Sequence, residues 1–148
     1  MAADWHGRPL HRAILATLKI RRELSLFPME RAETIRALCE LPRNYRSTGL
    51  SLVETVKASG YFGEPTPPSQ LEYETYIRNH PDLVADWVEY SGDQRCVPGW
   101  ELSPPGEARK VWEVGRYPDI PPVTYPDGVR ACAAFVARVV AQIAEGLP

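Results

Sequence analysis

Few side chains in this sequence have the types and spacing that covalent chemistry requires. Cys96 and His80 are a thiol and an imidazole that both fall in expected connections between elements, sixteen residues apart. A cysteine nucleophile needs its histidine base within about 3 Å, together with a site that stabilises an oxyanion. The separation along the chain neither requires nor excludes that geometry. One hypothesis is therefore a small enzyme that uses Cys96 or a buried carboxylate, in a pocket between a hairpin and helices.

The spacing of the cysteines and histidines argues against a metal site. The three cysteines include no C-x-x-C pair, and His6 and His11 lie five residues apart, which is not one face of a helix. The sequence also has no glycine-rich loop of the kind that binds phosphates. We therefore expect no metal and no cofactor. Cys39 and Cys132 fall within apolar helical patterns and are expected to be buried.

The side chains best suited to binding gather in the stretch VEYSGDQRCVPGWELS, residues 88–103. In a structural interpretation, Asp93 forms a turn and Trp100 anchors the core, and for Trp100 we favour this interpretation. In a functional interpretation, Asp93, Gln94, Arg95 and Trp100 form a patch that contacts another protein. Arg95 favours the second interpretation about as much as the first, because an arginine between turn residues has no periodic reason to be buried.

Three carboxylates, those of Asp82, Asp86 and Glu89, precede this stretch at helical spacing. An acidic helix face is most often a solvated surface. Like charges at this spacing nevertheless destabilise a helix slightly, which suggests that the face binds a partner with a basic surface. The predicted partner-binding residues are Asp82, Asp86, Glu89, Tyr90, Asp93, Gln94, Arg95 and Trp100.

The charge of the chain is unevenly distributed along its 148 residues. Residues 1–60 hold ten Lys/Arg and six Asp/Glu, whereas residues 61–148 hold seven and thirteen, so the net charge is −2. Domains that bind nucleic acid usually carry an overall positive charge, and we therefore expect no nucleic-acid partner. The basic stretches lie at residues 19–22 and 42–46, and the second includes Tyr45, an aromatic side chain of the kind that stacks on a base. Arg21 and Arg22 are expected to be solvated or paired with Glu23 and nearby acids.

The composition, with 44% hydrophobic and 24% charged residues, is that of an ordinary globular domain. The sequence contains no run of about 18 apolar residues, which a membrane helix would need. The N-terminal residues lack the pattern of a secretory signal. An odd number of cysteines fits a reducing compartment. We expect a cytoplasmic protein without membrane contact, and the sequence does not predict its oligomeric state.

Two helices are expected near the N-terminus, followed by two more that begin with capping boxes. Residues 10–24 and 29–41 would form an antiparallel hairpin, with Pro42 ending the second helix and residues 42–49 forming a polar connection. The pairs Ser51 with Glu54 and Ser69 with Glu72 have the capping-box spacing of a helix start. A fifth helix, capped by Asn79 or His80, would then present the acidic face.

The period of the apolar residues changes after Gly99. Residues 100–103 and 111–114 alternate apolar and polar side chains and predict a β-hairpin, whereas residues 116–128 contain several prolines and are expected to form a loop. Asp127 and Gly146 are the expected start and stop signals of a last helix with a broad apolar face. This helix should pack across the hairpin.

These elements predict one α+β domain spanning residues 1–148, mostly helical, with about six helices and a small antiparallel hairpin on the C-terminal helix. Its helical N-terminal part would span residues 8–60, and the helix pair, hairpin and C-terminal helix residues 68–146. A two-stranded hairpin is not stable alone, so its aromatic face must lie on helices.

The second half of the chain resembles small bacterial proteins that act as immunity or accessory partners of polymorphic toxins. The resemblance covers residues 81–145 and is carried by Tyr90, Ser91, Asp93, Arg95, Gly99, Trp100, Trp112, Gly115, Ala131 and Cys132. It implies a protein without chemistry of its own that binds and blocks a cognate toxin, often through an acidic surface against a basic cleft. A non-catalytic, immunity-type inhibitor is thus the leading hypothesis, with the small enzyme and a structural or oligomeric module as alternatives.

Overall fold

The computed structural model describes residues 30–93, 99–107, 110–116 and 120–146. This part of the chain has an α+β fold with six α-helices, a short 3₁₀ turn and a three-stranded antiparallel sheet, which confirms the predicted fold class. The elements are α2 (Arg31–Cys39), α3 (Leu41–Thr48), α4 (Leu52–Ala58), η1 (Tyr61–Gly63), α5 (Gln70–Asn79), α6 (Leu83–Ser91), β1 (Trp100–Ser103), β2 (Trp112–Arg116), β3 (Ile120–Tyr125) and α7 (Gly128–Ala144).

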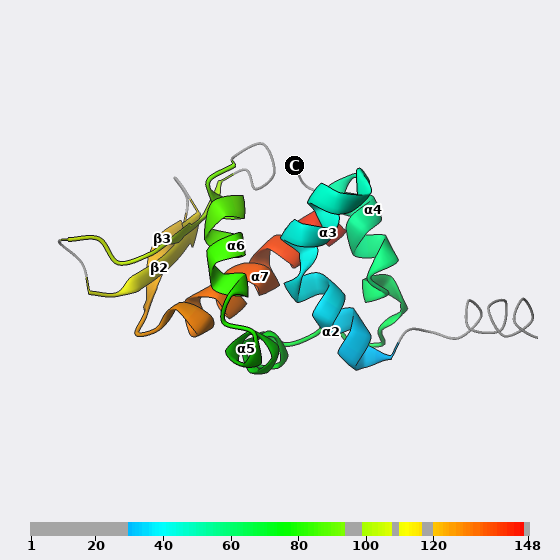
Figure 1. Ribbon diagram of the computed structural model, residues 1–148, viewed down its shortest axis with the longest axis horizontal. Coiled ribbons are helices and arrows are strands. Elements are labelled where there is room, and N and C mark those ends of the chain that lie inside the picture. The colour runs from blue at the N-terminus through cyan, green and yellow to red at the C-terminus, as the bar shows by residue number, and fades with distance from the viewer. Residues whose placement is uncertain (1–29, 94–98, 108–109, 117–119, 147–148) are drawn as a thin grey trace, which may run out of the picture.

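The C-terminal helix α7 runs through the centre of the fold, with the sheet and α6 around its first half, α4 near its end and α5 packed against it (Figure 1). The Asp127 side chain accepts from the Arg130 amide at its start, and Gly146, with φ 70°, follows its last turn, as predicted. Positions on every side of this helix are buried, including both Cys132 and Phe135. The helix is therefore the common support for all other layers.

The sheet has the order β1-β2-β3, and its first two strands form the predicted hairpin. Leu102, Val114 and Val123 lie side by side across it on the face toward α7. Leu102 and Val114 are buried, whereas Val123 is exposed. The cover that α7 provides therefore ends at β3.

The expectation of a loop over residues 116–128 is wrong, because residues 120–125 form β3. Proline is tolerated in an edge strand, since one side of that strand makes no ladder hydrogen bonds. Successive amides of a strand point to opposite sides, so one of the two adjacent prolines, Pro121 or Pro122, removes a donor from the open edge, which hinders pairing with other chains. The opposite edge is protected by α6, because the Leu102 amide of β1 donates to the Ser91 hydroxyl at 2.8 Å.

The polar connection predicted at residues 42–49 is also wrong, because Leu41–Thr48 form α3. Proline lacks an amide hydrogen, and the amides of the first helical turn need no partner within the helix. Pro42 therefore opens α3 instead of ending α2, and the chain only bends at Glu40, which ends α2 and precedes α3. Gly49, with φ 69°, ends α3.

Both predicted capping boxes are confirmed, since Ser51 with Glu54 starts α4 and Ser69 with Glu72 starts α5. The predicted cap of the next helix is wrong, because α6 begins at Leu83 with Asp82 in the cap position and no side chain caps it. The Trp87 indole fixes α6 by donating to the Cys39 carbonyl at 2.7 Å. The buried residues of all these elements form one cluster.

The predicted helix at residues 10–24 lies outside the described residues, so the hairpin it would form with α2 stays a prediction. The single-domain boundaries likewise stay a prediction for the chain as a whole. No helix in the ranges that the structure describes has the length and apolarity needed to cross a membrane.

Candidate protein-binding surface

The acidic side chains of α6 face the arginines of α3. Arg43 lies 2.7 Å from Asp82 and 2.6 Å from Asp86, and Arg46 lies 3.3 Å from Glu89. The hydrogen bond from Arg43 lowers the pKa of Asp82, and its bonds to the two aspartates raise the pKa of Arg43. The acidic side chains of α6 therefore have partners within the chain, and their binding to another protein stays a prediction.

These ion pairs were not predicted from the sequence because α3 itself was not predicted. The predicted connection at residues 42–49 would have left Arg43 and Arg46 without fixed positions, whereas α3 presents both on the face that contacts α6. Asp82 and Glu89 remain 65% and 71% exposed, and exposed pairs of this kind contribute little to stability. Three carboxylates and two guanidinium groups leave this surface with a small net charge.

Two of the eight predicted partner-binding residues are buried. Tyr90 and Trp100 are 3% and 8% exposed and belong to the core, with the Trp87 ring against Tyr90 and the Arg138 guanidinium 5.5 Å from the Trp100 ring centre. The interpretation of Trp100 as a core anchor is confirmed, and neither ring is available to a partner. Asp93 is half-buried after the end of α6.

Gln94, Arg95 and Cys96 lie outside the described residues, so their predicted roles stay predictions. The structure does place His80, whose ring stacks on Tyr76 with centres 4.2 Å apart and whose Nδ1 lies 2.9 Å from the Tyr76 carbonyl oxygen. Cys39 and Cys132 are buried as expected, and burial raises the pKa of both thiols, that of Cys39 to about 12. These two thiols are protonated at neutral pH and unsuited to nucleophilic attack.

Sequence reasoning missed an open groove of about 510 Å³ between α2 and α5. Its lining comes from one stripe of each helix: Ala32, Glu33, Ile35 and Arg36 from α2, and Glu72, Thr75, Tyr76 and Asn79 from α5. These positions recur at three- and four-residue spacing, so each stripe follows its helix for more than one turn. The groove therefore has the shape that a third helix would fill.

One exposed apolar side chain, Leu71, extends this surface along α5 beyond the groove. Leu71 is 69% exposed, more than any other large apolar side chain in the part of the chain described, and it lies one helical turn from Thr75. A single exposed leucine is ordinary on a protein surface, so Leu71 is of interest here only because it lies beside the groove. The helical spacing of Leu71, Thr75 and the half-buried Tyr76 is the signal that could have indicated this surface, but the buried stripe of Tyr73 and Ile77 hides it in the sequence.

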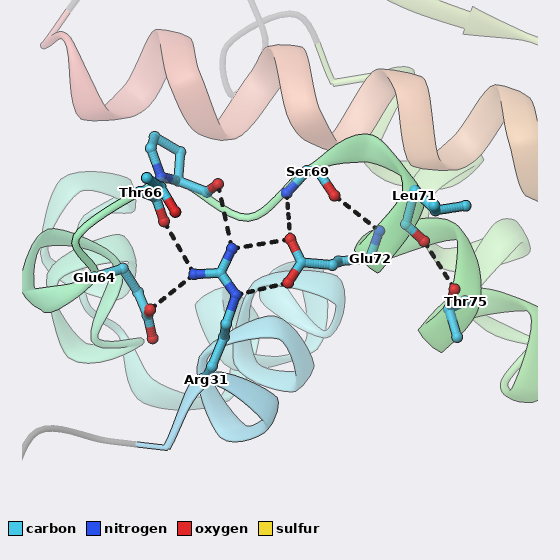
Figure 2. A network of polar contacts seen from close by, with 8 residues as sticks. Arg31, Glu64, Thr66, Ser69, Leu71, Glu72 and Thr75 are labelled. Atoms are coloured by element: carbon cyan, nitrogen blue, oxygen red, sulfur yellow. Dashed lines mark hydrogen bonds and ion pairs between the residues drawn. The ribbon is translucent and has the colours of Figure 1, made fainter.

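Arg31 joins α2 to α5 beside the groove through the polar contacts drawn in Figure 2. Its guanidinium donates to both carboxylate oxygens of Glu72, at 2.6 and 2.9 Å, and to Glu64 at 2.9 Å. It also donates to the Thr66 and Pro67 carbonyls, so α2 is tied both to the connection before α5 and to α5 itself. The Arg31 bonds, with help from the Ser69 amide, lower the pKa of Glu72 to about 2.

The other side of the groove contains a phenol that is already engaged. The Tyr76 hydroxyl donates to Glu40 at 2.8 Å. Burial and this hydrogen bond raise the pKa of Tyr76 to about 12. Neither Tyr76 nor Glu72 is therefore poised to take up a proton near neutral pH.

Comparisons with known proteins add no identification. No family model, no curated protein and no solved structure matches this chain. Within the described ranges, no group of three or more His, Cys, Asp or Glu side chains is placed to hold a metal ion.

Proposed function

We propose that this chain is a non-catalytic protein-binding protein whose docking site is the groove between α2 and α5. The observation that carries the proposal is the open groove of about 510 Å³, with the exposed Leu71 side chain at its end. Two parallel stripes of side chains on neighbouring helices are typical of a surface that receives a partner helix. The occupant is an amphipathic helix of another protein.

The residues that cap α2 favour a basic occupant. The helices α2 and α5 themselves hold three glutamates and three arginines, and the cap residues Glu30 and Glu40 bring the net charge of residues 30–40 and 70–79 to −2. Basic side chains flanking the apolar stripe of the partner helix would meet this surface favourably. The partner is thus still expected to be basic, but the surface that receives it is the groove and not the α6 face.

The immunity-type inhibitor is a narrower form of this proposal. The residues that carry the resemblance include Tyr90, Trp100, Ala131 and Cys132, all of which are buried. Their burial in the core leaves open which surface would meet a toxin. The toxin hypothesis depends on the partner, and it predicts that the bound protein arrests growth when it is expressed without this chain.

The experiment is capture of partners from the native host with three forms of the full chain. Ala32→Arg places a long charged side chain in the groove, and Ala85→Arg makes the same change at an exposed helical position of α6. We expect wild type and Ala85→Arg to retain the same protein, and Ala32→Arg to lose it by about tenfold or more.

Circular dichroism and thermal unfolding of both variants check that each one folds. Loss of the partner from Ala85→Arg alone would move the docking site to the α3 and α6 surface. Equal capture by all three forms would refute the groove as the site. A retained small molecule that is released from wild type but not from Ala32→Arg would favour the enzyme hypothesis instead.

A further inference from the structure

The chain contains a segment with the chemistry that the groove favours. Residues 10–24 carry Leu10, Ile14, Leu15 and Leu18 at helical spacing, and residues 8–24 hold five Lys/Arg against a single Glu. This is an amphipathic, basic segment, although its structure lies outside the described residues. We propose that residues 10–24 of the same chain occupy the α2/α5 groove, so that a partner must displace them.

The dimensions of the two surfaces agree. From Leu10 to Leu18 an α-helix advances about 12 Å, at 1.5 Å per residue. On α5, the groove and the adjoining Leu71 extend from Leu71 to Asn79. This is the same number of residues as from Leu10 to Leu18, so the two surfaces have the same length. The apolar stripe of residues 10–18 is therefore long enough to cover Leu71, Thr75 and Tyr76.

The connection to the groove is short. Residues 25–30 separate the segment from Arg31, the first residue of α2. Six residues span at most about 20 Å, which allows the chain to turn back along α2 and keeps the segment close to the groove. A short connection of this kind gives the segment an effective concentration in the millimolar range, so even a weak contact would be populated.

The charges also complement one another. The basic side chains of residues 8–24 would approach residues 30–40 and 70–79, whose five glutamates, including the α2 cap residues Glu30 and Glu40, outnumber their three arginines. Part of this acidic charge is already balanced by Arg31, which holds Glu64 and Glu72. The apolar stripe therefore has to supply most of the affinity, and charge sets the orientation.

This inference rests on the proposed function only in using the same groove, and it makes residues 10–24 a competitor of the partner. It is tested in the full chain by replacing Thr75 with the photocrosslinking residue benzoylphenylalanine. Thr75 is exposed and lines the groove. The expected result is a crosslink to residues 10–24 within one chain, mapped by mass spectrometry and seen as a monomer on a denaturing gel at every protein concentration.

Matched variants of the segment make the test specific. Leu18→Asp places a carboxylate in the apolar stripe and should lower the crosslinked fraction about tenfold. Ala16→Asp makes a similar change on the opposite face of the predicted helix and should leave the fraction unchanged. The same photocrosslinking residue at Val53, an exposed position on α4, should give no crosslink to residues 10–24.

The outcomes separate this inference from the proposed function. A crosslink between two chains, or none to residues 10–24, would overturn the inference even if a host protein is captured through the groove. A crosslink within one chain that Leu18→Asp abolishes would support it even if no host protein is captured. If Ala16→Asp and Leu18→Asp reduce the crosslink equally, the stripe is not the contact and the inference is wrong.

Discussion

Thr34 offers a prediction in which the sign of the effect is informative. Its side chain is fully buried on α2, and its hydroxyl has no hydrogen-bond partner among the described residues. A buried hydroxyl without a partner costs about 1–3 kcal/mol relative to a hydrated one. Replacing it with a methyl group of nearly the same shape removes that cost, and threonine and valine have similar helix propensities. Thr34→Val is therefore expected to stabilise the protein by about 1 kcal/mol.

Thr55 provides the matched control for this change. It is also buried, on α4, but its hydroxyl donates to the Ser51 carbonyl at 2.8 Å. Thr55→Val loses that hydrogen bond and should destabilise the protein by about 1 kcal/mol. The same substitution is thus expected to act with opposite sign at the two positions.

Urea unfolding followed by tryptophan fluorescence measures both variants, because the buried Trp87 reports on the core. With a slope of about 2 kcal/mol per molar urea, a change of 1 kcal/mol moves the midpoint by about 0.5 M. The thermal midpoint should shift by about 2–4 °C in the same direction. Destabilisation by Thr34→Val comparable to that of Thr55→Val would refute the reasoning, because it would mean that the Thr34 hydroxyl has a partner in the folded protein.

Two further predictions concern the sheet and the groove. A β-carbon added at Gly128 would lie 2.6 Å from the Trp112 ring, so Gly128→Ala should destabilise the protein by about 1–3 kcal/mol. Gly106→Ala is the control, because nothing lies within 4 Å of a β-carbon there, and it should be nearly neutral in the same urea titration. Equal effects of the two substitutions would contradict the contact with Trp112. Glu72 has a pKa lowered from 4.5 to about 2, so it stabilises the fold above pH 4.5 and this contribution is lost as the pH falls through 2. Glu72→Gln should therefore cost about 1 kcal/mol at pH 7, because solvent screens the ion pair, and the difference from wild type should shrink toward pH 2; a difference that is constant with pH would show that the Arg31 contact does not act through the Glu72 charge.

Local signals in the sequence were enough to place most helices. Ser51 with Glu54, Ser69 with Glu72 and Asp127 each satisfy amides of their own first turn, so the necessary information lies within four residues. The apolar period of α7 and the alternation around Trp100 are similarly local. These features predict element type without any knowledge of tertiary contacts.

The errors arise where proline has more than one permitted position. Pro42 can end a helix or begin one. It begins α3 here, where Leu41 and Pro42 are buried. Pro121 and Pro122 suit a loop or an edge strand, and the outcome depends on pairing of residues 120–125 with β2. Both decisions are made by contacts distant in sequence, which a local pattern does not contain.

The candidate site was harder to predict from the sequence than the fold, because it depends on contacts between residues that are far apart along the chain. A row of carboxylates is conspicuous in the sequence, but its field depends on whether cations lie within a few ångströms, and Arg43 and Arg46 lie forty residues away along the chain. A carboxylate 2.6 Å from a guanidinium presents mainly a dipole to a partner one Debye length away, about 8–10 Å at moderate salt. The α6 charges are thus largely satisfied within the chain, whereas the groove leaves Leu71 exposed and two helical stripes uncovered. Binding energy is available where the fold has left apolar surface in contact with water, and on that criterion the α2/α5 groove is the better candidate for the docking site.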